Sequence, residues 1–359
     1  MLVASLGATA MVSPLMRIGI VGATGQVGGA MRAILAKRQF PVSELRFFAS
    51  ARSAGRLLSW GDQEIAVEDA DTADYSGLDI VLFSAGGSTS LTLAPRVAES
   101  GAIVVDNSSA WRMDPDVPLV VPEVNSHALS SIPKRIVANP NCSTIQMVVA
   151  LKPLHDLWGI RRIVVSTYQA SSGKGAKALV DLDSQVEALG AGQPIPQPCS
   201  HIDRLAGNVL AHDWTPAEGG YSEEEWKMVR ETRKIMGDES ILISPTTVRV
   251  PVRVGHSESI HVEFHCAVSL DAAKEALKRA PGVVLIDNPG MQEAPTPLQA
   301  EGRDDVFVGR LRQDLTTPNA LNLWVVADNL RKGAATNAVQ IAEVLLRAGY
   351  LNPKQNQHG

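Results

Sequence analysis

The sequence predicts an α/β protein built in two parts. In the first half of the 359 residues, short apolar strands alternate with helical segments, which is typical of a doubly wound parallel sheet. A glycine-rich turn joins the first of these strands to the first helix. From about Ile160 the strands become longer and alternate apolar with polar residues, as in a mixed, largely antiparallel sheet. We therefore expect a Rossmann-like dinucleotide-binding domain and a second, α+β domain.

Length and composition exclude several classes of protein. The chain has room for two domains of about 150 residues each, and 45% of its residues are hydrophobic. Its net charge is -5 without a basic tract, so no nucleic-acid partner is expected. The longest apolar runs have the length of strands, so no membrane partner is expected either. Three scattered cysteines do not make a disulfide framework, which favours a cytoplasmic location.

The first expected strand, residues 17–21, runs directly into a glycine turn and a helix expected at 29–37. Gly22, Gly25 and Gly28 give the spacing GxxGxxG instead of the usual GxGxxG. Glycine lets the backbone bend tightly and approach a pyrophosphate, which then rests on the helix N-terminus. The turn therefore favours a dinucleotide site, although such glycines also occur where a turn merely closes a helix onto a sheet.

The second expected strand, residues 44–49, indicates which dinucleotide is bound. It ends without the acidic residue that would grip a free ribose 2′-hydroxyl. It is followed by Ser50, Arg52, Ser53 and Arg56, which offer the hydroxyls and cations that a 2′-phosphate requires. We therefore expect NADP in preference to NAD, the alternative being a solvated polar loop.

Further strands are expected at 79–83 and 102–106. Ligands bind at the carboxyl ends of the strands of a parallel sheet, so the polar turns there should converge on one crevice. These turns are residues 84–87, 107–109 and 139–142. Arg112 lies just beyond the second turn and is a candidate for binding an anion, the alternative being an ordinary surface arginine.

Cys142 lies where a strand expected at 135–138 gives way to a helix expected at 145–157. Pro140 prevents the preceding residues from being helical, whereas apolar residues recur at helical spacing after Cys142. The thiol should therefore meet unpaired backbone N–H groups and the positive end of the helix dipole, which favour a thiolate. Because a thiolate attacks carbonyl carbon, Cys142 is the candidate nucleophile. The alternative is a small buried cysteine in a core.

Three long strands are expected in the second half, at residues 161–169, 248–254 and 260–268. In the last of them Cys266 falls on the apolar face, where it should be buried and inert. His261 and His265 fall on the polar face, and without a third ligand nearby no metal site is expected.

A helix is expected at 222–236, where Ser222 and Glu225 match a capping box. Glu224 and Lys227 lie on neighbouring turns of this helix and predict a surface salt bridge of small value.

His256 lies at a break of small and polar residues between two strands. We expect it to be exposed enough to exchange protons, and an ordinary histidine pKa suits acid/base chemistry near neutrality. Arg249 lies seven residues upstream, so in an unbroken strand the two side chains would point to opposite faces. Only a distortion at Pro251 or Gly255 would let both meet one substrate.

A last helix, expected at 335–346, should return to the first domain and bring Gly333 toward the dinucleotide. The dinucleotide-binding domain is therefore expected to comprise residues 16–143 and 329–359, and the second domain residues 144–328. Residues 1–15 lack the basic start of a signal peptide, and we expect them to form a disordered N-terminal extension.

Together these segments resemble the aspartate-β-semialdehyde dehydrogenases. The resemblance runs from Met16 to about Tyr350 and rests on the motifs NPNCST, RVPVRVGHSESI, EEEWKMVRETRKI and NLRKGAATNAVQIAE. It implies NADPH-dependent reduction of L-aspartyl 4-phosphate to L-aspartate 4-semialdehyde and phosphate, in the synthesis of lysine through diaminopimelate, of methionine and of threonine. It also implies that the second domain carries catalysis and dimerisation, in a homodimer or homotetramer.

The resemblance further implies roles for individual residues. Cys142 would form a thioester, His256 would act as the acid/base, and Gln169 would position the substrate. The expected substrate-binding residues are Arg249 for the carboxylate, Glu224 for the amine, and Arg112, Asn141 and Lys227 for the phosphate. The expected cofactor-binding residues are Gly22, Thr24, Gly25, Gln26, Val27, Ser50, Arg52, Ser53, Ser84, Gly86, Ser172, Gly173, Asn329 and Gly333.

Two other functions compete with this interpretation. An N-acetylglutamyl-phosphate reductase would share the cofactor and the thioester, but NPN before the cysteine and the segment 249–256 argue against it. A non-catalytic NADP-binding homologue would not need Cys142 and His256 together. One departure from the family is Lys174, where many members carry alanine, and it bears on the cofactor contacts of that loop.

Overall fold

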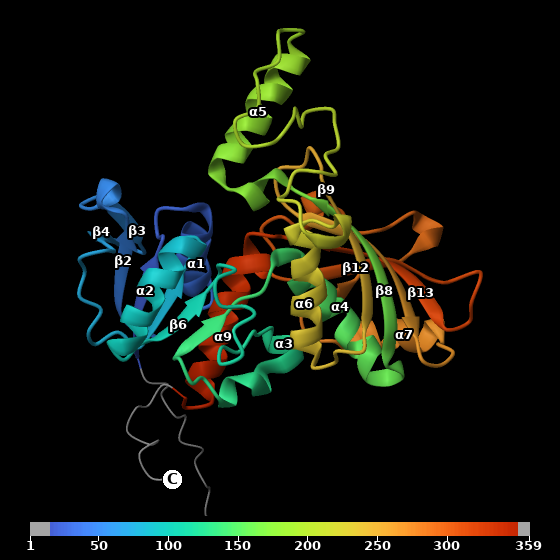
Figure 1. The fold of residues 1–359 in the computed structure, drawn as a ribbon, viewed down its shortest axis with the longest axis horizontal. Coiled ribbons are helices and arrows are strands. Elements are labelled where there is room, and N and C mark those ends of the chain that lie inside the picture. The colour runs from blue at the N-terminus through green and yellow to red at the C-terminus, as the bar shows by residue number, and fades with distance from the viewer. Residues whose placement is uncertain (1–14, 351–359) are drawn as a thin grey trace, which may run out of the picture.

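The computed structural model describes residues 15–350, which form two β-sheets lying side by side (Figure 1). The first sheet occupies the left of the view in Figure 1 and the second the right, and one helix projects from the top of the molecule. The expected extension at residues 1–15 lies almost wholly outside the described residues. The architecture is the predicted one, a Rossmann-like part and an α+β part.

The first sheet has seven strands in the order β3-β4-β2-β1-β5-β6-β7, and every neighbouring pair except β3–β4 is parallel. The chain passes from β1 to β2 on one side and later to β5 on the other. The carboxyl ends of β1 and β5 therefore flank a topological switch point, where such sheets bind ligands. The strands are β1 (Met16–Val21), β2 (Val42–Ala49), β3 (Leu57–Trp60), β4 (Gln63–Asp69), β5 (Ile80–Phe83), β6 (Ile103–Asp106) and β7 (Ile136–Ala138).

Helices cover both faces of this sheet. On one face α1 (Gln26–Lys37) and α9 (Thr336–Arg347) pack together into one apolar cluster, so the last helix does return to the first sheet. On the other face α2 (Gly87–Glu99) packs into a second cluster. Three short elements complete this part of the chain: the 3₁₀ turns η1 (Ala51–Ser53) and η2 (Ser126–Ser130), and the helix α3 (Pro122–Asn125).

The second sheet has six strands in the order β11-β12-β13-β10-β8-β9. Its three central pairings are antiparallel, whereas β11–β12 and β8–β9 are parallel. The strands are β8 (Ile160–Gln169), β9 (Leu242–Arg249), β10 (His256–Phe264), β11 (Val283–Leu285), β12 (Val306–Gln313) and β13 (Ala320–Ala327). The accompanying helices are α4 (Cys142–Trp158), α5 (Ala176–Gly190), α6 (Glu223–Met236), α7 (Leu270–Arg279) and α8 (Pro297–Ala300), with 3₁₀ turns η3 (Ser171–Lys174), η4 (Glu218–Gly220) and η5 (Pro289–Met291).

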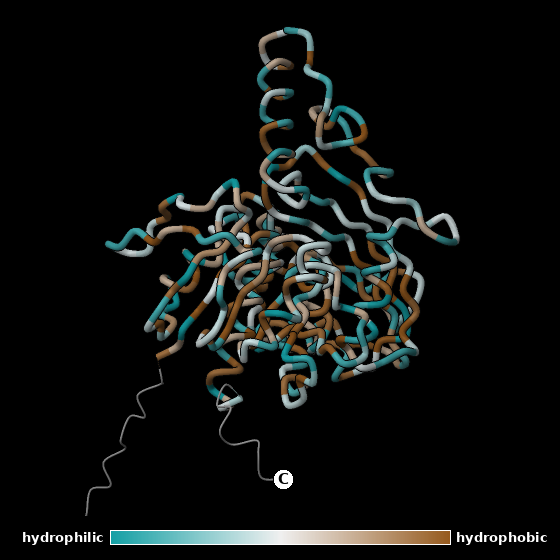
Figure 2. The backbone as a smooth tube through the Cα atoms, turned by 60° about the vertical axis from the view of Figure 1, so that its left-hand side comes forward, coloured by the Kyte–Doolittle hydropathy of each residue, from teal (hydrophilic) through white to brown (hydrophobic). Residues whose placement is uncertain are grey.

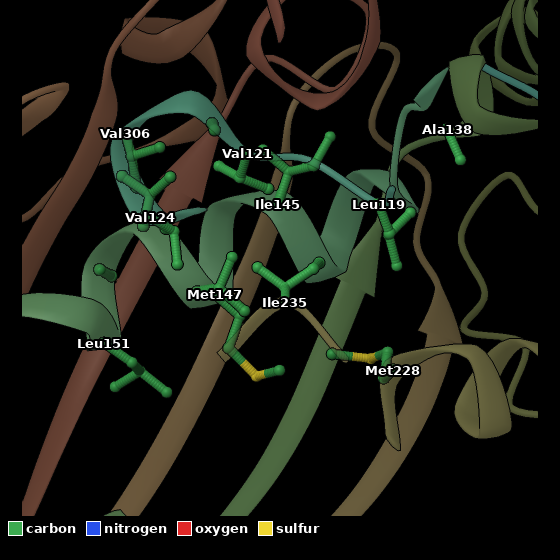
Figure 3. Packing of buried hydrophobic residues seen from close by; sticks show 14 of the residues in the cluster. Leu119, Val121, Val124, Ala138, Ile145, Met147, Leu151, Met228, Ile235 and Val306 are labelled. Atoms are coloured by element: carbon green, nitrogen blue, oxygen red, sulfur yellow. The ribbon is translucent and has the colours of Figure 1, made fainter. Parts of the chain in front are cut away.

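Helix α4 lies in the core between the two parts and is buried on nearly every side. All residues from Ser143 to Leu151 are buried, which is expected of a helix that runs inside a large core. In Figure 3 its Ile145, Met147 and Leu151 lie among side chains from the segment after β6 and from α6. Hydrophobic segments concentrate in the body of the molecule, whereas the projecting arm around α5 alternates polar and apolar residues (Figure 2). The N-terminus of α4 is therefore held rigidly between the two sheets.

Two expected strands are wrong in their limits. β9 ends at Arg249 instead of Val254, because Pro251 has no N–H to donate and Gly255 takes a φ of +96°. β10 covers residues 256–264 instead of 260–268, since its pairing with β8 and β13 ends there. Cys266 consequently lies beyond the strand and is exposed, not part of the core. The chain is thus broken between Arg249 and His256, which is the condition under which both side chains can meet one substrate.

The observed helix starts lie closer to the predicted ones than these strand limits do. The capping box is confirmed, since Ser222 Oγ accepts from the Glu225 N–H and the Glu225 carboxylate accepts from the Ser222 N–H. Helix α4 begins at Cys142, three residues earlier than predicted, because the Asn141 side chain caps it. The limits of the two domains stay a prediction.

A buried lysine ties the start of α9 to the first sheet. Lys332 lies in a π-helical turn (η6, Arg331–Ala335), and its side chain is fully buried. Its Nζ donates to Glu123 Oε2 at 2.7 Å, to Asn337 Oδ1 at 3.0 Å and to Gln340 Oε1 at 2.7 Å. All three ammonium protons are thus satisfied, which a buried charge requires.

We predict that Lys332→Met lowers the free energy of unfolding by about 3–5 kcal/mol, because it leaves the Glu123 carboxylate buried without its partner. The double variant Lys332→Met/Glu123→Gln should recover much of this loss, since no unpaired charge is left. Urea unfolding followed by circular dichroism measures both. A loss below about 1 kcal/mol in the single variant would contradict the prediction.

Candidate active site

A pocket of about 470 Å³ lies at the carboxyl ends of β5, β6 and β7 and reaches across to the second sheet. The three polar turns that follow these strands contribute to its lining, as the strand order predicts. The predicted site residues that line it are Val27, Ser84, Gly86, Arg112, Asn141, Cys142, Gln169, Ser172, Gly173, Glu224, Lys227, Arg249, Asn329 and Gly333. Residues from distant parts of the sequence thus meet around one thiol.

A second groove of about 300 Å³ adjoins the first at Ser84. It is lined by the predicted residues Gly22, Thr24, Gly25, Ser50 and Ser84. Gln26, Arg52 and Ser53 line neither cavity; the latter two belong to η1, beside Ser50, and Arg52 is exposed.

Glycine is required for steric reasons at two positions of the first turn, whereas the third glycine leaves the end of a helix uncovered. A Cβ at Gly22 would lie 2.2 Å from the Ser84 carbonyl oxygen, and one at Gly28 would lie 2.3 Å from the Gly22 carbonyl oxygen. These two glycines therefore let α1 close onto the sheet. Gly25 has more room and is the N-cap of α1, with no side chain to cover the first N–H groups of the helix. An open helix N-terminus facing a groove fits the pyrophosphate of a dinucleotide.

Cys142 is the first residue of α4 and is fixed from two sides. Asn141 caps the helix, with its Oδ1 accepting from the N–H groups of Ser143 at 3.0 Å and Thr144 at 3.2 Å. On the other side Gly333 packs so closely that a Cβ there would lie 2.9 Å from Cys142 Cβ. The backbone and Cβ of Cys142 are therefore held in place.

The surroundings of Cys142 favour a neutral thiol and not the expected thiolate. Burial raises the pKa of the Cys142 thiol to about 12, and the Glu224 carboxylate adds to the rise. Arg249, Arg112 and the Ser143 N–H act in the opposite direction but are outweighed. The positive end of the α4 dipole lies at the sulfur and stabilises a thiolate. This stabilisation is smaller than the free energy lost when the thiolate is removed from water. Without ligands the nucleophile candidate is a neutral thiol.

Glu224 is at the centre of a buried hydrogen-bonded group, not in the surface salt bridge that local spacing predicted. Its Oε1 accepts from Asn141 Nδ2 at 2.8 Å and lies 3.3 Å from Gln169 Nε2, and its Oε2 accepts from Lys227 Nζ at 3.1 Å. Burial opposes ionisation, but Lys227 and these hydrogen bonds prevail and lower the pKa of Glu224. A buried carboxylate therefore faces the pocket beside Cys142.

Arg249 is held by residues that the sequence did not single out. Its Nη1 donates to the Ala170 carbonyl oxygen at 2.8 Å, and its guanidinium lies 4.9 Å from the ring of Trp214. Its Nε is 3.5 Å from Asp213 Oδ2. Lys174 Nζ donates to the other oxygen of Asp213 at 2.7 Å, so the residue that departs from the family supports Asp213. Asp213 and Trp214 lie in an irregular loop without periodicity, and no local signal identifies them.

His256 lies beneath the pocket, fully buried and not exposed as expected. Its Nδ1 accepts from the Ala170 N–H at 2.9 Å, so the neutral ring carries its proton on Nε2. Burial, together with Arg249, lowers the pKa of His256 to about 3. Nε2 points toward Gly173, where a Cβ would lie 3.3 Å away, and the same Cβ would lie 2.9 Å from Arg249 Nη1. The imidazole is therefore a fixed hydrogen-bond donor near neutral pH.

Arg112 is buried between the sheets, which rules out an ordinary surface arginine. Its Nε donates to the Asn139 carbonyl oxygen and its Nη2 to the Asn107 carbonyl oxygen. Its Nη1 forms an ion pair with Glu231 Oε1 at 3.0 Å. Glu231 was missed by sequence reasoning, although it follows Glu224 and Lys227 at helical spacing, which could have indicated it.

Ser172 and Asn329 form one side of the pocket. Ser172 Oγ lies 2.9 Å from Asn329 Nδ2 and 3.0 Å from Asn329 Oδ1, and Oδ1 also accepts from the Gly255 N–H at 2.9 Å. These bonds connect the loop after β8, where Gly173 lies against Arg249 and His256, to the segment after β13, where Gly333 lies against Cys142.

Among residues 15–350, no cluster of three or more His, Cys, Asp or Glu side chains is arranged to hold a metal ion. His261 lies 3.3 Å from Asp314 and His265 is exposed. Within the same range, no helix combines the length and apolar character needed to cross a membrane.

Comparison with known proteins shows the family to which the chain belongs. Residues 17–132 match the family described as "Semialdehyde dehydrogenase, NAD binding domain", and residues 151–332 match "Semialdehyde dehydrogenase, dimerisation domain". The chain is 55% identical to an aspartate-semialdehyde dehydrogenase of Aquifex aeolicus over 93% of its length and 99% of that protein. A Vibrio cholerae aspartate semialdehyde dehydrogenase II complexed with ASA superposes with a TM-score of 0.91 at 45% identity, covering 93% of this chain and 99% of that chain. An enzyme of the same name from Candida albicans with NADP gives 0.73 at 26% identity, covering 94% and 100%.

Because the pKa of Cys142 is raised to about 12, we predict slow alkylation of this thiol by iodoacetamide at pH 7. The rate should rise about tenfold per pH unit between pH 7 and 10, as the thiolate fraction grows. Mass spectrometry of the peptide containing Cys142 separates it from the exposed Cys199 and Cys266. A plateau in its rate below pH 8.5 would show a thiolate instead.

Proposed function

The chain belongs to the aspartate-semialdehyde dehydrogenase family, and we propose that it reduces L-aspartyl 4-phosphate with NADPH to L-aspartate 4-semialdehyde and phosphate. The reaction is reversible, and it would serve the synthesis of lysine through diaminopimelate, of methionine and of threonine. The observation that carries the proposal is one pocket in which the Cys142 thiol is surrounded by Arg112, Lys227 and Arg249 and by the carboxylate of Glu224. These charges are complementary to a substrate with two anionic ends and an ammonium group.

Each end of the substrate has a candidate partner. Arg249 would bind the α-carboxylate with a guanidinium fork that a lysine could not imitate. Glu224 would bind the ammonium group, and its ionised state inside the pocket supports this role. Arg112, Lys227 and the amide of Asn141 would bind the phosphate. An N-acetylated substrate carries no ammonium charge, so Glu224 also argues against an N-acetylglutamyl-phosphate reductase.

In the proposed chemistry Cys142 Sγ attacks the acyl carbon of aspartyl phosphate. The C–O bond to phosphate breaks, a thioester forms, and the thiol proton leaves with the phosphate. Transfer of a hydride, which the bound dinucleotide would supply, to the thioester carbon then breaks the C–S bond and releases the aldehyde, and one proton from water restores the thiol. The neutral resting state of Cys142 is compatible with this order, because the phosphate dianion can accept the proton.

We assign His256 a narrower role than the acid/base function that the resemblance implies. With Nδ1 occupied by the Ala170 N–H, Nε2–H can donate a hydrogen bond but cannot accept a proton. It would stabilise the negative charge that develops on the acyl oxygen, as an oxyanion-hole donor does. Gln169, in contact with Glu224, would orient the substrate amine.

The groove beside Ser84 would hold the dinucleotide. Gly22, Thr24, Gly25 and the start of α1 would bind its pyrophosphate, and Gln26 and Val27 follow in the same turn. Ser50, Arg52 and Ser53 would bind a 2′-phosphate, which supports NADP over NAD. Ser84, Gly86, Ser172, Gly173, Asn329 and Gly333 would surround the nicotinamide. The bound dinucleotide would supply hydride in the reductive direction and accept it in reverse.

We also propose that the enzyme works as a homodimer or homotetramer in the cytoplasm. The match of residues 151–332 to a dimerisation domain supports self-association. Tyr168 of β8 is exposed and its ring lies 5.4 Å from that of Trp324 of β13. An aromatic pair of this kind on the outer face of a sheet suits a contact with a second subunit.

We predict that the purified protein forms NADPH from NADP only when aspartate semialdehyde and phosphate, or arsenate, are both supplied. Cys142→Ala should abolish the reaction, because no nucleophile is left, while NADP binding followed by fluorescence is retained. NAD should support a much lower rate. Absorbance at 340 nm measures the rate, with N-acetylglutamate semialdehyde as the competing substrate. Activity that survives in Cys142→Ala would refute the assignment of the nucleophile.

For His256 we predict that glutamine, which keeps an N–H donor, lowers kcat about tenfold, whereas alanine lowers it about 10²- to 10³-fold. The pH profile of kcat/KM should contain no group near pH 6.5 that belongs to His256, since burial lowers its pKa to about 3. Equal losses in the two variants, or a group near pH 6.5 that disappears in His256→Gln, would restore the acid/base role.

A further inference from the structure

We propose that Glu231 is a positioning residue for phosphate, which orients Arg112 and the backbone next to Cys142 at the same time. The inference rests on the proposed function, since it assigns Arg112 to the phosphate. Glu231 is not one of the catalytic or binding groups of the proposed function.

Glu231 lies on the face of α6 that meets the nucleophile. Glu224, Lys227 and Glu231 follow one another at spacings of three and four residues, so they share one side of the helix. Glu224 lies in the first turn of α6, and Glu231 lies about two turns further along the helix. Only 1% of Glu231 is exposed. A glutamate buried to this extent needs partners for both carboxylate oxygens.

Each carboxylate oxygen of Glu231 has one such partner. Oε1 accepts from Arg112 Nη1 at 3.0 Å, and Oε2 accepts from the Asn141 N–H at 2.6 Å. Arg112 comes from the segment after β6, whereas Asn141 immediately precedes Cys142 at the start of α4. One carboxylate therefore bridges the guanidinium and the turn that carries the nucleophile, in addition to the direct bond from Arg112 Nε to the Asn139 carbonyl oxygen.

The contacts of Arg112 determine what it can offer to an anion. A guanidinium has five N–H bonds. Nε–H is used by the Asn139 carbonyl oxygen, and one N–H on each terminal nitrogen is used by Asn107 and by Glu231. One N–H on each terminal nitrogen is left, and the guanidinium lines the pocket. N–H groups on the two terminal nitrogens of a guanidinium are donors for phosphate oxygens.

Charge and geometry predict opposite results when Glu231 is neutralised. If Glu231 acted only as a negative charge near the phosphate, its removal would strengthen phosphate binding. If it positions Arg112 and Asn141, its removal weakens phosphate binding in spite of the lost repulsion. A glutamine cannot accept from both partners, because its amide nitrogen would face an N–H donor.

The test is Glu231→Gln in the full-length enzyme, assayed in the direction that consumes phosphate. We expect the KM for phosphate to rise about tenfold, the worth of one charge-assisted hydrogen bond, while the KM values for aspartate semialdehyde and NADP change less than about twofold. Glu223→Gln removes the same charge from an exposed position on the same helix and should leave all three KM values unchanged.

A double-mutant cycle with Arg112→Lys separates positioning from general damage. If Glu231 acts through Arg112, adding Glu231→Gln to Arg112→Lys should raise the KM for phosphate by less than about twofold further. If Glu231→Gln does not fold, as judged by NADP binding, Glu231→Asp takes its place. This variant keeps the charge but withdraws it by one methylene, and it should raise the KM for phosphate in the same selective way.

The outcomes separate the two proposals. A wild-type enzyme without phosphate-dependent NADPH formation refutes the proposed function itself. If the wild type is active, a lower KM for phosphate in Glu231→Gln, a parallel rise of all three KM values, or additive effects in the double-mutant cycle overturn the positioning role.

Discussion

The site depends on how Asn141 is held, because this residue connects the nucleophile to both parts of the molecule. Its side-chain oxygen caps α4, its side-chain nitrogen donates to Glu224, and its backbone N–H donates to Glu231. Both glutamates belong to α6, whereas the strand that precedes Asn141 belongs to the first sheet. The sulfur of Cys142 is therefore positioned by a single residue whose main polar groups are all engaged.

Burial also determines which groups of the site are charged. Cys142 and His256 are both neutral near pH 7, because removing their charged forms from water is unfavourable. Glu224 is ionised at the same depth, since Lys227 and two amide groups surround it. Among the residues assigned to the reaction, charge is thus confined to the groups that would bind the substrate, and the groups that would carry out the chemistry are neutral until a substrate arrives.

Three residues behind the pocket hold Arg112 and Arg249 in place. Asp213 and Trp214 support Arg249, and Glu231 supports Arg112. Asp213 and Trp214 could not be found from local sequence patterns, because they lie in an irregular loop, whereas the helical spacing of Glu231 after Glu224 and Lys227 is a signal that could have indicated it. A guanidinium has five donors, and it can be placed accurately only when most of them are satisfied by the protein.

Local sequence patterns are enough to predict the alternation of strands and helices in the first half, the glycine turn at Gly22 and the cysteine at the start of a helix. These features follow from local rules: hydrophobic periodicity, the missing N–H of proline and the conformational freedom of glycine. Only the tertiary structure decided that His256 is buried, that Glu224 is inside and not on the surface, and that Cys142 is a neutral thiol. A pKa and an exposed fraction depend on which distant segments cover a side chain, and local patterns contain no information about those segments.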